Sequence, residues 1–421
     1  MSFLWKLQYN FLSLKCALSL LLFLIIFTLL QIWTDRSMLH YTHIIPSLQM
    51  LSDNGTIQSN ISMKHILIWD KYYLMTTNRG NQIFPRLQCR VNNCLFTENK
   101  DLFNGDYTQF DAVLFAEQVL GQDFKLPEKR AQSQIYIFTT IESAYHVPAC
   151  EVYHDDFFNW TFTYRLDSDV LWPHFIVRNA KRQVVGPSID VKWKQYTRKR
   201  INSNILKILH KKTKAAAWLV SNCKADSARD DYLTRLQENL YHFSLQIDVY
   251  GECSKVKCAN DNCGEMLAKD YYFYMAFENS FSEDYVTEKV LDGYHHYVVP
   301  IVYGGANYTR FLPPGSYLNA REIHPYNLAY IMYQSIKRPM KYHQFFRWTN
   351  YYTLDNDIPG LHPLCNLCEA LNSEKAKIPK TYKNFRFWWN GRNGMKWCLS
   401  RNFWNETSLM HIDIRDMFHM Y

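Results

Sequence analysis

The chain has 421 residues, of which 48% are apolar and 16% aromatic, enough to bury the cores of two domains of ordinary size. Its formal net charge of +8 favours acidic partners, and a nucleoside diphosphate or a nucleic acid would both qualify. The basic residues are scattered, however, and the densest run, 192–214, is typical of a solvated linker and helix, so we do not expect a nucleic-acid partner. No G-x-G-x-x-G, G-x-x-x-x-G-K-S/T or G-x-S-x-G motif occurs, which removes the usual support for dinucleotide oxidation, P-loop hydrolysis and serine hydrolysis.

An apolar stretch from Cys16 to Trp33 predicts a transmembrane signal-anchor. Its 18 residues span roughly 27 Å as a helix, enough for a thin bilayer. Lys6 and Lys15 precede it, so the positive-inside rule makes 1–15 a cytosolic tail and places the rest of the chain in the lumen. A cleaved signal peptide is the alternative, but no small-x-small cleavage site follows the stretch.

Residues 34–63 are polar and lack periodicity, which predicts a lumenal stem. Five sequons agree with a lumenal glycoprotein: Asn54, Asn60, Asn159, Asn307 and Asn405. Apart from Cys16, ten of the eleven cysteines remain, an even number that predicts disulfides in an oxidising compartment, with a pairing that the sequence does not give. The alternative is a zinc site from the C-terminal cluster His362, Cys365, Cys368 and Cys398.

From residue 64 onward, short apolar runs alternate with longer amphipathic segments. The runs 65–70, 111–115 and 134–138 predict buried strands, and the aperiodic, charged segment 172–200 predicts a domain junction. A second series follows, with strands at 215–220, 246–250, 271–277 and 298–303 and helices at 225–241 and 286–296. This alternation predicts an α/β protein with parallel sheets and two Rossmann-like domains, 64–190 and 191–421, separated by a cleft, the second with a C-terminal extension.

The most informative segment is 277–289, F-E-N-S-F-S-E-D-Y-V-T-E-K. It joins an apolar strand to an expected helix, whose N-terminal N–H groups and dipole would favour an anion. Lys289, one turn into that helix, adds a positive charge. The loop also supplies carboxylates, an amide, hydroxyls and a phenol, which suit a sugar nucleotide. The simpler interpretation is a capped helix that follows a buried strand.

This segment resembles the signature of the α-1,3-fucosyltransferases, glycosyltransferase family 10. Other segments between roughly 64 and 400 resemble the same family: Ile141-Glu142-Ser143, NWTFTYRLDSD at 159–169, WLVSNC at 218–223, Ser227-Ala228-Arg229 and YVVPIVYGGANYTRFLPPGSYLNA at 297–320. The resemblance implies the GT-B arrangement. It also implies inverting transfer of L-fucose from GDP-β-L-fucose to the 3-hydroxyl of GlcNAc in glycoprotein glycans.

Two basic residues match basic positions of the family and are our candidates for binding the diphosphate, Arg229 and Lys289. Ser221 and Asn222 follow a strand at its carboxyl end, where such sheets bind ligands, and can donate hydrogen bonds to phosphate oxygens. The alternative for Arg229 is a surface salt bridge with a neighbouring aspartate, Asp226 or Asp230.

By the same resemblance, Asn279, Tyr285 and Glu288 would line the donor site, with Glu288 on ribose or fucose hydroxyls. The alternative for Glu288 is a first-turn carboxylate that complements the helix dipole. Glu278 is a candidate for orienting its neighbours.

Glu142 resembles the family's catalytic carboxylate and is our candidate for the general base, a role that contributes about 10² to 10⁴-fold to the rate. Partial burial would raise its pKa toward neutrality. The pair Asp167 and Asp169 has the D-x-D spacing of a site for Mg²⁺ or Mn²⁺, but two basic residues already serve the phosphate. We therefore interpret the pair as structural or acceptor-lining, and predict no metal ligand and no tightly bound cofactor.

The predicted protein is thus a single-pass type II Golgi membrane enzyme with GDP-fucose and a GlcNAc-containing glycan as its substrates. Two other functions stay open: a catalytically silent glycan-binding protein on the same fold, and a metal-dependent transferase of another sugar. The acceptor also stays open between the N-glycan core and N-acetyllactosamine. The sequence of 297–320 and the C-terminal C-x-x-C resemble the enzymes of invertebrates and plants that modify the innermost GlcNAc of the N-glycan core.

Overall fold

The computed structural model describes residues 62–70, 80–121, 124–197, 200–258, 262–391 and 398. All of them belong to one compact unit, Ile61–Tyr421. The predicted tail, signal-anchor and most of the stem lie outside the described residues, as do the sequons at Asn54, Asn60 and Asn405. Within the described ranges, none of the helices has the length and apolarity needed to cross a membrane.

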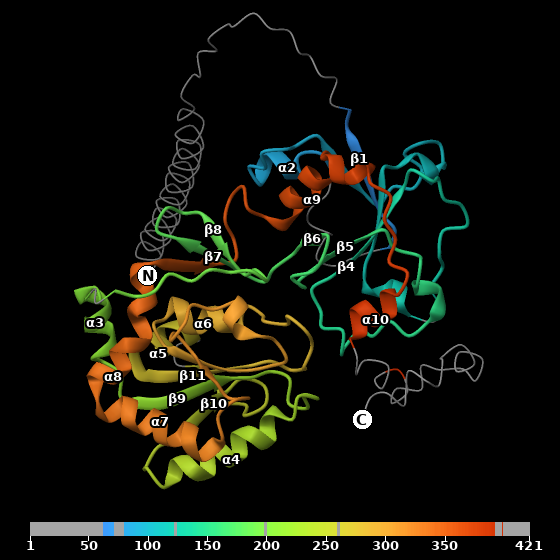
Figure 1. The fold of residues 1–421 in the computed structure, drawn as a ribbon. Coiled ribbons are helices and arrows are strands. Elements are labelled where there is room, and N and C mark those ends of the chain that lie inside the picture. Colours follow the sequence, from blue (N-terminus) through green and yellow to red (C-terminus); the bar gives the residue numbers. More distant parts are fainter. Residues whose placement is uncertain are drawn as a thin grey trace, which may run out of the picture. The chain divides into compact units, whose positions relative to one another are not determined.

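The first sheet is built from parallel strands in the order β2-β1-β3-β4-β5-β6 (Figure 1). The strands are β1 Lys64–Ile68, β2 Cys94–Thr97, β3 Ala112–Phe115, β4 Ile135–Thr140, β5 Trp160–Thr163 and β6 Val170–Leu171. The three strands predicted here are confirmed with ends shifted by one or two residues. β3 is buried along its whole length and β4 beyond its first residue, as expected for a parallel sheet covered on both faces.

Both faces of the first sheet are covered partly by the C-terminal segment. The short helix α2 Ile83–Arg86 and the helix α9 Pro363–Leu371 pack on one face, and α10 Phe385–Asn390 packs on the other. Our prediction assigned residues 191–421 to the second domain, but the cores place 363–390 against the first sheet. No local pattern in the sequence predicts that the C-terminal segment packs on the first sheet, because these contacts join residues more than 200 positions apart.

The second sheet is also parallel, in the order β10-β9-β11-β12-β13. Its strands are β9 Lys214–Leu219, β10 Ile247–Tyr250, β11 Tyr271–Phe277, β12 Val299–Tyr303 and β13 Leu318–Asn319. Helices α5 Cys263–Asp270 and α6 Lys289–His295 pack on one face (Figure 1). The other face carries α3 Ser203–Leu209, α4 Arg229–Tyr241, α7 Pro325–Lys337 and α8 Pro339–His343. Parallel sheets with helices on both faces confirm the predicted α/β class.

The segment 172–200, in which we predicted the domain junction, contains a β-hairpin. β7 Ile176–Asn179 and β8 Val184–Gly186 pair antiparallel, and β14 Tyr352–Asp355 adds a third strand beside β7. The strands are short and the third is supplied from much later in the chain, so no period of two residues is visible in the sequence.

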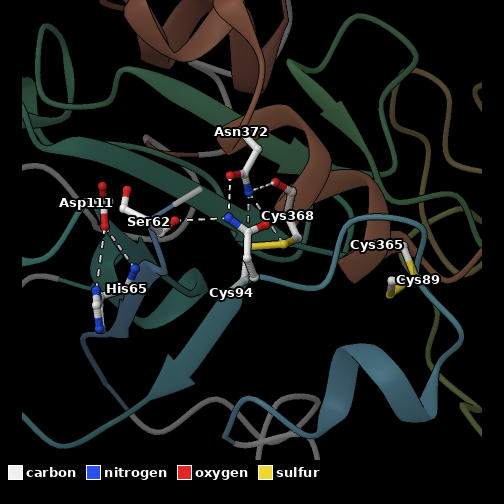
Figure 2. Close-up of a disulfide and its surroundings, with 9 residues drawn as sticks. Ser62, His65, Cys89, Cys94, Asp111, Cys365, Cys368 and Asn372 are labelled. Atoms are coloured by element: carbon white, nitrogen blue, oxygen red, sulfur yellow. Dashed lines mark hydrogen bonds and ion pairs between the residues drawn. A yellow bond between two sulfur atoms is a disulfide. The ribbon is translucent and has the colours of Figure 1, made fainter. Parts of the chain in front are cut away.

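Disulfides join the cysteines of the described residues as Cys89–Cys365, Cys94–Cys368, Cys150–Cys398, Cys223–Cys253 and Cys258–Cys263. Asn372 lies beside the second of these and donates to the Cys368 carbonyl at 2.9 Å (Figure 2). The predicted disulfides are confirmed. The zinc alternative is wrong, because its three cysteines are all oxidised and His362 Nδ1 instead accepts the Leu364 N–H at the start of α9.

Candidate functional site

The loop that follows β11 is organised around a buried carboxylate. Glu278 is completely buried, and its Oε1 accepts the backbone N–H of Thr287 at 2.8 Å. Its Oε2 lies 3.1 Å from the Lys289 Nζ, and the Thr287 hydroxyl donates to both carboxylate oxygens. Glu278 can therefore orient its neighbours in a definite way. Its carboxylate holds Thr287 and Lys289, at the end of the loop, next to the start of the loop.

Lys289 is the cation that Glu278 holds in place. Its side chain is 29% exposed, so the ammonium remains within reach of a ligand. Burial acts to lower the pKa of Lys289, but the carboxylates of Glu278 and Glu288 act against it and leave the pKa above its ordinary value. A lysine in this position stays charged throughout the physiological range.

The helix after the loop differs from our prediction. It begins at Lys289 rather than at Val286 and has only seven residues, so Lys289 is its first residue and Glu288 its N-cap. The Glu288 side chain makes no capping hydrogen bond. The positive charge at this point therefore comes mainly from Lys289 rather than from a helix terminus.

Arg229 lies behind this loop rather than on the surface. It is 3% exposed, and its guanidinium donates to the Phe277 carbonyl at 2.9 Å and to the Asn222 carbonyl at 2.6 Å. Burial lowers its pKa from the ordinary arginine value. The salt-bridge alternative for Arg229 is wrong, because the guanidinium ties together the carboxyl ends of β9 and β11 instead.

Ser221 and Asn222 follow β9 and are exposed at the same edge of the second sheet. The disulfide Cys223–Cys253 anchors the next residue. Asn279 is half-buried on the neighbouring strand end, where its carbonyl accepts the Ser227 N–H at 3.2 Å. The structure thus brings the predicted diphosphate-binding residues of two segments to one edge of the sheet.

Two adjacent glycines let the chain after β12 approach the loop closely. A Cβ on Gly305 would lie 2.8 Å from the backbone N and O of Ser282. A Cβ on Gly304 would lie 3.2 Å from the Glu278 Cγ of the loop and 2.4 Å from the Tyr308 hydroxyl. Cβ atoms are essentially never found this close to other atoms. Glycines at 304 and 305 are therefore a steric requirement of the packing around the loop.

The same loop is fastened to the first sheet by polar contacts. The Ser280 and Ser143 hydroxyls lie 2.7 Å apart, Ser282 Oγ accepts the Tyr145 N–H at 3.2 Å, and Asp284 accepts the Leu166 N–H at 3.0 Å. Ser143 and Tyr145 follow β4, on either side of Ala144. The loop of the second sheet and the end of β4 are therefore held together.

Glu142 lies on that strand end, next to Ser143. Its backbone N–H donates to the Thr140 hydroxyl at 3.0 Å, and its side chain is exposed. The expected partial burial of Glu142 is not observed. The carboxylate is instead accessible to a ligand, next to a residue that contacts the loop 278–288.

Tyr285 and Glu288 differ in their surroundings. Tyr285 is 3% exposed and packs in the core of the first sheet, with its ring 5.2 Å from that of Tyr164. Glu288 is 59% exposed and its Oε2 lies 3.4 Å from His174 Nδ1. This histidine contact is the main cause that lowers the pKa of Glu288 to about 2. Glu288 is thus an accessible anion, whereas Tyr285 is a packing residue between the loop and the first sheet.

Comparison with known proteins identifies the family. A family model described as glycosyltransferase family 10 (fucosyltransferase), C-terminal part, matches residues 209–388, and a fucosyltransferase N-terminal model matches residues 61–175. Alpha-(1,3)-fucosyltransferase C of Drosophila melanogaster is 33% identical over 374 residues, which cover 82% of this chain and 84% of that relative. The chain belongs to glycosyltransferase family 10. The predicted family is confirmed, and the chain is a fucosyltransferase.

Further relatives are less complete matches to this fucosyltransferase. Glycoprotein 3-alpha-L-fucosyltransferase A of Drosophila melanogaster is 29% identical over 344 residues, which cover 80% of this chain and 62% of that relative. A crystal structure described as alpha1,3-fucosyltransferase with GDP-fucose aligns with 14% identity and a TM-score of 0.46, over 77% of this chain and 94% of that one.

The D-x-D pair of the fucosyltransferase is engaged in ion pairs with other parts of the chain. Asp167 accepts two hydrogen bonds from Arg165, at 2.9 and 2.8 Å, and one from Trp388. Asp169 is buried and contacts Lys375, Lys380 and the Tyr382 hydroxyl of the C-terminal segment. These contacts favour the structural interpretation of the pair.

Sequence reasoning did not single out the residues that hold the site together. Ser227 is buried and donates to the Glu278 carbonyl at 2.9 Å, and the side chains of Ser280 and Ser282 bridge to the end of β4. Thr287 contacts both Glu278 and Lys289. Serine and threonine residues follow no periodicity that would reveal such contacts in a sequence. Their position within the family segments was the one signal that could have identified them.

Proposed function

We propose that this fucosyltransferase transfers L-fucose from GDP-β-L-fucose to the 3-hydroxyl of GlcNAc in glycoprotein glycans, with inversion at the anomeric carbon. The observation that carries the proposal is the fastening of the loop 278–288 to the end of β4, with the Ser143 and Ser280 hydroxyls 2.7 Å apart. This contact supports a single site in which the exposed Glu142 carboxylate and the Lys289 ammonium, which come from different sheets, act together. The names of the relatives, alpha-(1,3)- and 3-alpha-L-fucosyltransferases, support the same linkage.

In the proposed reaction Glu142 takes the proton of the acceptor hydroxyl as that oxygen attacks the anomeric carbon of fucose. The bond between this carbon and the diphosphate oxygen breaks at the same time, on the opposite face of the sugar. Lys289 stabilises the charge that develops on the departing GDP. Arg229 adds its charge from behind the loop while it fixes the Asn222 carbonyl.

The remaining candidates contact the donor in this proposal. Ser221, Asn222 and Asn279 bind the nucleotide from the strand ends, and the Glu288 carboxylate accepts hydrogen bonds from ribose or fucose hydroxyls. Tyr285 is the exception, because its buried ring packs the loop against the first sheet and does not contact the donor. No residue of this set needs a metal ion, because the two basic residues supply the positive charge.

We further propose a GT-B arrangement in which the first sheet binds the acceptor, the second binds GDP-fucose and a cleft separates them. The C-terminal segment from residue 363 then belongs structurally to the acceptor side. A location in the Golgi lumen, with residues 16–33 as the membrane anchor, is supported by the disulfides of the described residues, which require an oxidising compartment. We propose the N-glycan core as the first acceptor to test.

The test uses the full-length chain with GDP-fucose and two acceptors, a core N-glycan and N-acetyllactosamine, with and without EDTA. We expect fucose on one of the two acceptors, insensitivity to EDTA, and a loss of about 10² to 10⁴-fold in kcat for Glu142→Gln with GDP binding retained. Glu151→Gln, the same change at another carboxylate of the first domain, is the matched control and should keep full activity.

Each result has a clear reading. Loss of activity in EDTA together with loss in Asp169→Ala would favour the metal-dependent alternative. Retention of GDP binding without transfer to either acceptor would favour the silent glycan-binding protein. Full activity of Glu142→Gln would remove Glu142 as the base.

A further inference from the structure

His174 is a largely buried histidine that contacts two segments of the proposed site, the end of β4 and the end of the loop 278–288. It follows β6, and its side chain is only 9% exposed. Its Nε2 lies 3.2 Å from the Ile141 carbonyl, and its Nδ1 lies 3.4 Å from Glu288 Oε2. Ile141 immediately precedes Glu142. A single imidazole ring therefore connects the strand end that carries the proposed base with the carboxylate proposed to bind the donor.

The two partners decide how many protons the ring carries. A carbonyl oxygen can only accept a hydrogen bond, so Nε2 must carry a hydrogen. Glu288 is 59% exposed, and an exposed glutamate is ionised above its ordinary pKa of about 4, so this carboxylate likewise only accepts. Both contacts are favourable at once only for the doubly protonated imidazolium. In the neutral ring, Nδ1 would present a lone pair to the Glu288 anion.

The other groups around the ring do not supply a competing charge at its nitrogens. The rings of Tyr164 and Tyr285 lie 6.1 and 5.8 Å from it, and burial raises the pKa of both phenols, so they stay neutral. The charged groups of the elements packed here are Glu288 and Lys289 at the start of α6, Asp284 in the loop, Arg165 after β5 and Glu142 after β4. Among the contacts that the structure gives for His174, Glu288 is the carboxylate that meets the ring directly.

We propose that the His174 imidazolium is a positioning residue that holds Glu288 in its donor-binding orientation and ties it to the strand end that carries Glu142. The proposal rests on the proposed function, since it assigns a regulator to the same site. When His174 loses its proton, the contact with Glu288 is lost and the carboxylate is free to rotate into solvent. Donor affinity therefore falls as pH rises.

The test measures the KM and kcat of the full-length chain with GDP-fucose from about pH 5 to about pH 9. The Kd of GDP-fucose is measured by calorimetry at the same pH values. Two variants separate the ring nitrogens: the amide nitrogen in His174→Asn falls near the position of Nδ1, and that in His174→Gln reaches the position of Nε2. His242→Asn, at an exposed histidine that ends α4, is the matched control.

We expect the wild-type KM and Kd to rise about tenfold with pH, the value of one charge-assisted hydrogen bond to a half-exposed carboxylate. His174→Asn keeps the donor to Glu288 and should give a low KM at every pH with a reduced kcat. His174→Gln keeps the donor to Ile141 and should give a KM raised about tenfold at every pH. Glu288→Gln, an exposed and conservative change, should also remove the pH dependence.

A merely structural role for His174 would lower the melting temperature of both variants without separating KM from kcat. The proposal is overturned if the pH dependence of the Kd survives in both His174 variants, or if the wild-type Kd does not depend on pH. Absence of fucosyl transfer by the wild type would refute the proposed function alone, because the Kd measurements still decide the role of His174. Absence of both transfer and donor binding would overturn both.

Discussion

Replacement of Glu278 by glutamine tests whether the buried carboxylate organises the donor loop. Glu278 is completely buried and accepts hydrogen bonds from Thr287 and Lys289. The glutamine carbonyl can still accept the Thr287 N–H, but its amide group then meets Lys289 Nζ with a donor in place of an anion. The variant therefore removes one buried charge-assisted contact and changes little in side-chain volume.

The cost follows from the exposure of the two partners. Removing one partner of a fully buried ion pair costs about 3 to 5 kcal/mol. Lys289 is 29% exposed and keeps its contact with the Thr287 hydroxyl at 2.9 Å, so solvent and this oxygen recover part of the loss. We expect a destabilisation of about 2 kcal/mol, which lowers the melting temperature of a domain of this size by about 4 to 8 °C.

Thermal unfolding of the full-length chain, followed by tryptophan fluorescence, measures this shift. Glu283→Gln is the matched control in the same loop: Glu283 is 56% exposed and 3.8 Å from Arg310, and an exposed pair contributes at most about 1 kcal/mol. We also expect a higher KM for GDP-fucose in Glu278→Gln only. Equal melting temperatures for the two variants would show that the buried carboxylate does not organise the loop.

Three further predictions concern the first sheet. Burial lowers the pKa of His154 to about 4 from 6.5, so on acidification the unfolded chain binds this proton first. We therefore expect wild-type stability to fall by on the order of 3 kcal/mol as pH drops from about 6.5 to about 4, measured by urea unfolding, and His154→Gln to lack this part of the slope. Asp169→Asn should lose about 2 kcal/mol of stability with an unchanged response to EDTA, because the residue holds Lys380 and Tyr382 of the C-terminal segment; an EDTA-sensitive wild type would contradict this. The double variant Cys94→Ala and Cys368→Ala should lose about 4 kcal/mol, and melting at the wild-type temperature would refute a structural role for this disulfide.

Seven strands of the two parallel sheets were predicted, because each is a short apolar run with a local signature, whereas β2, β5, β6 and β13 were not predicted. β11 was predicted to its end residues, and β1, β3, β4 and β9 to within two residues. Such strands are buried on both faces, so their composition alone distinguishes them from the amphipathic segments around them. The candidate site residues have a different origin, since their positions came from the family segments rather than from periodicity.

What the sequence could not show depends on contacts between distant residues. The hairpin β7–β8 is completed by β14, and the first sheet is covered by α9 and α10. The burial of Arg229 is also a tertiary effect: an arginine between two aspartates at a helix start looks exposed in sequence. Its environment is set by the carbonyls of Phe277 and Asn222, which no local pattern encodes.

The connectivity of the disulfides allows the two sheets to be completed in the reverse of the order in which they are synthesised. Cys89, Cys94 and Cys150 leave the ribosome 276, 274 and 248 residues before their partners, whereas the disulfides beside the second sheet close over 30 and 5 residues. The second sheet can therefore become covalently complete first, although it is made later. Until the C-terminal segment arrives, the first sheet holds three unpaired thiols and lacks α9 and α10, the helices that this segment packs on its two faces. In the proposed oxidising compartment, a chain that stops before Cys365 would keep those thiols exposed, and thiol-dependent retention can distinguish it from the finished enzyme.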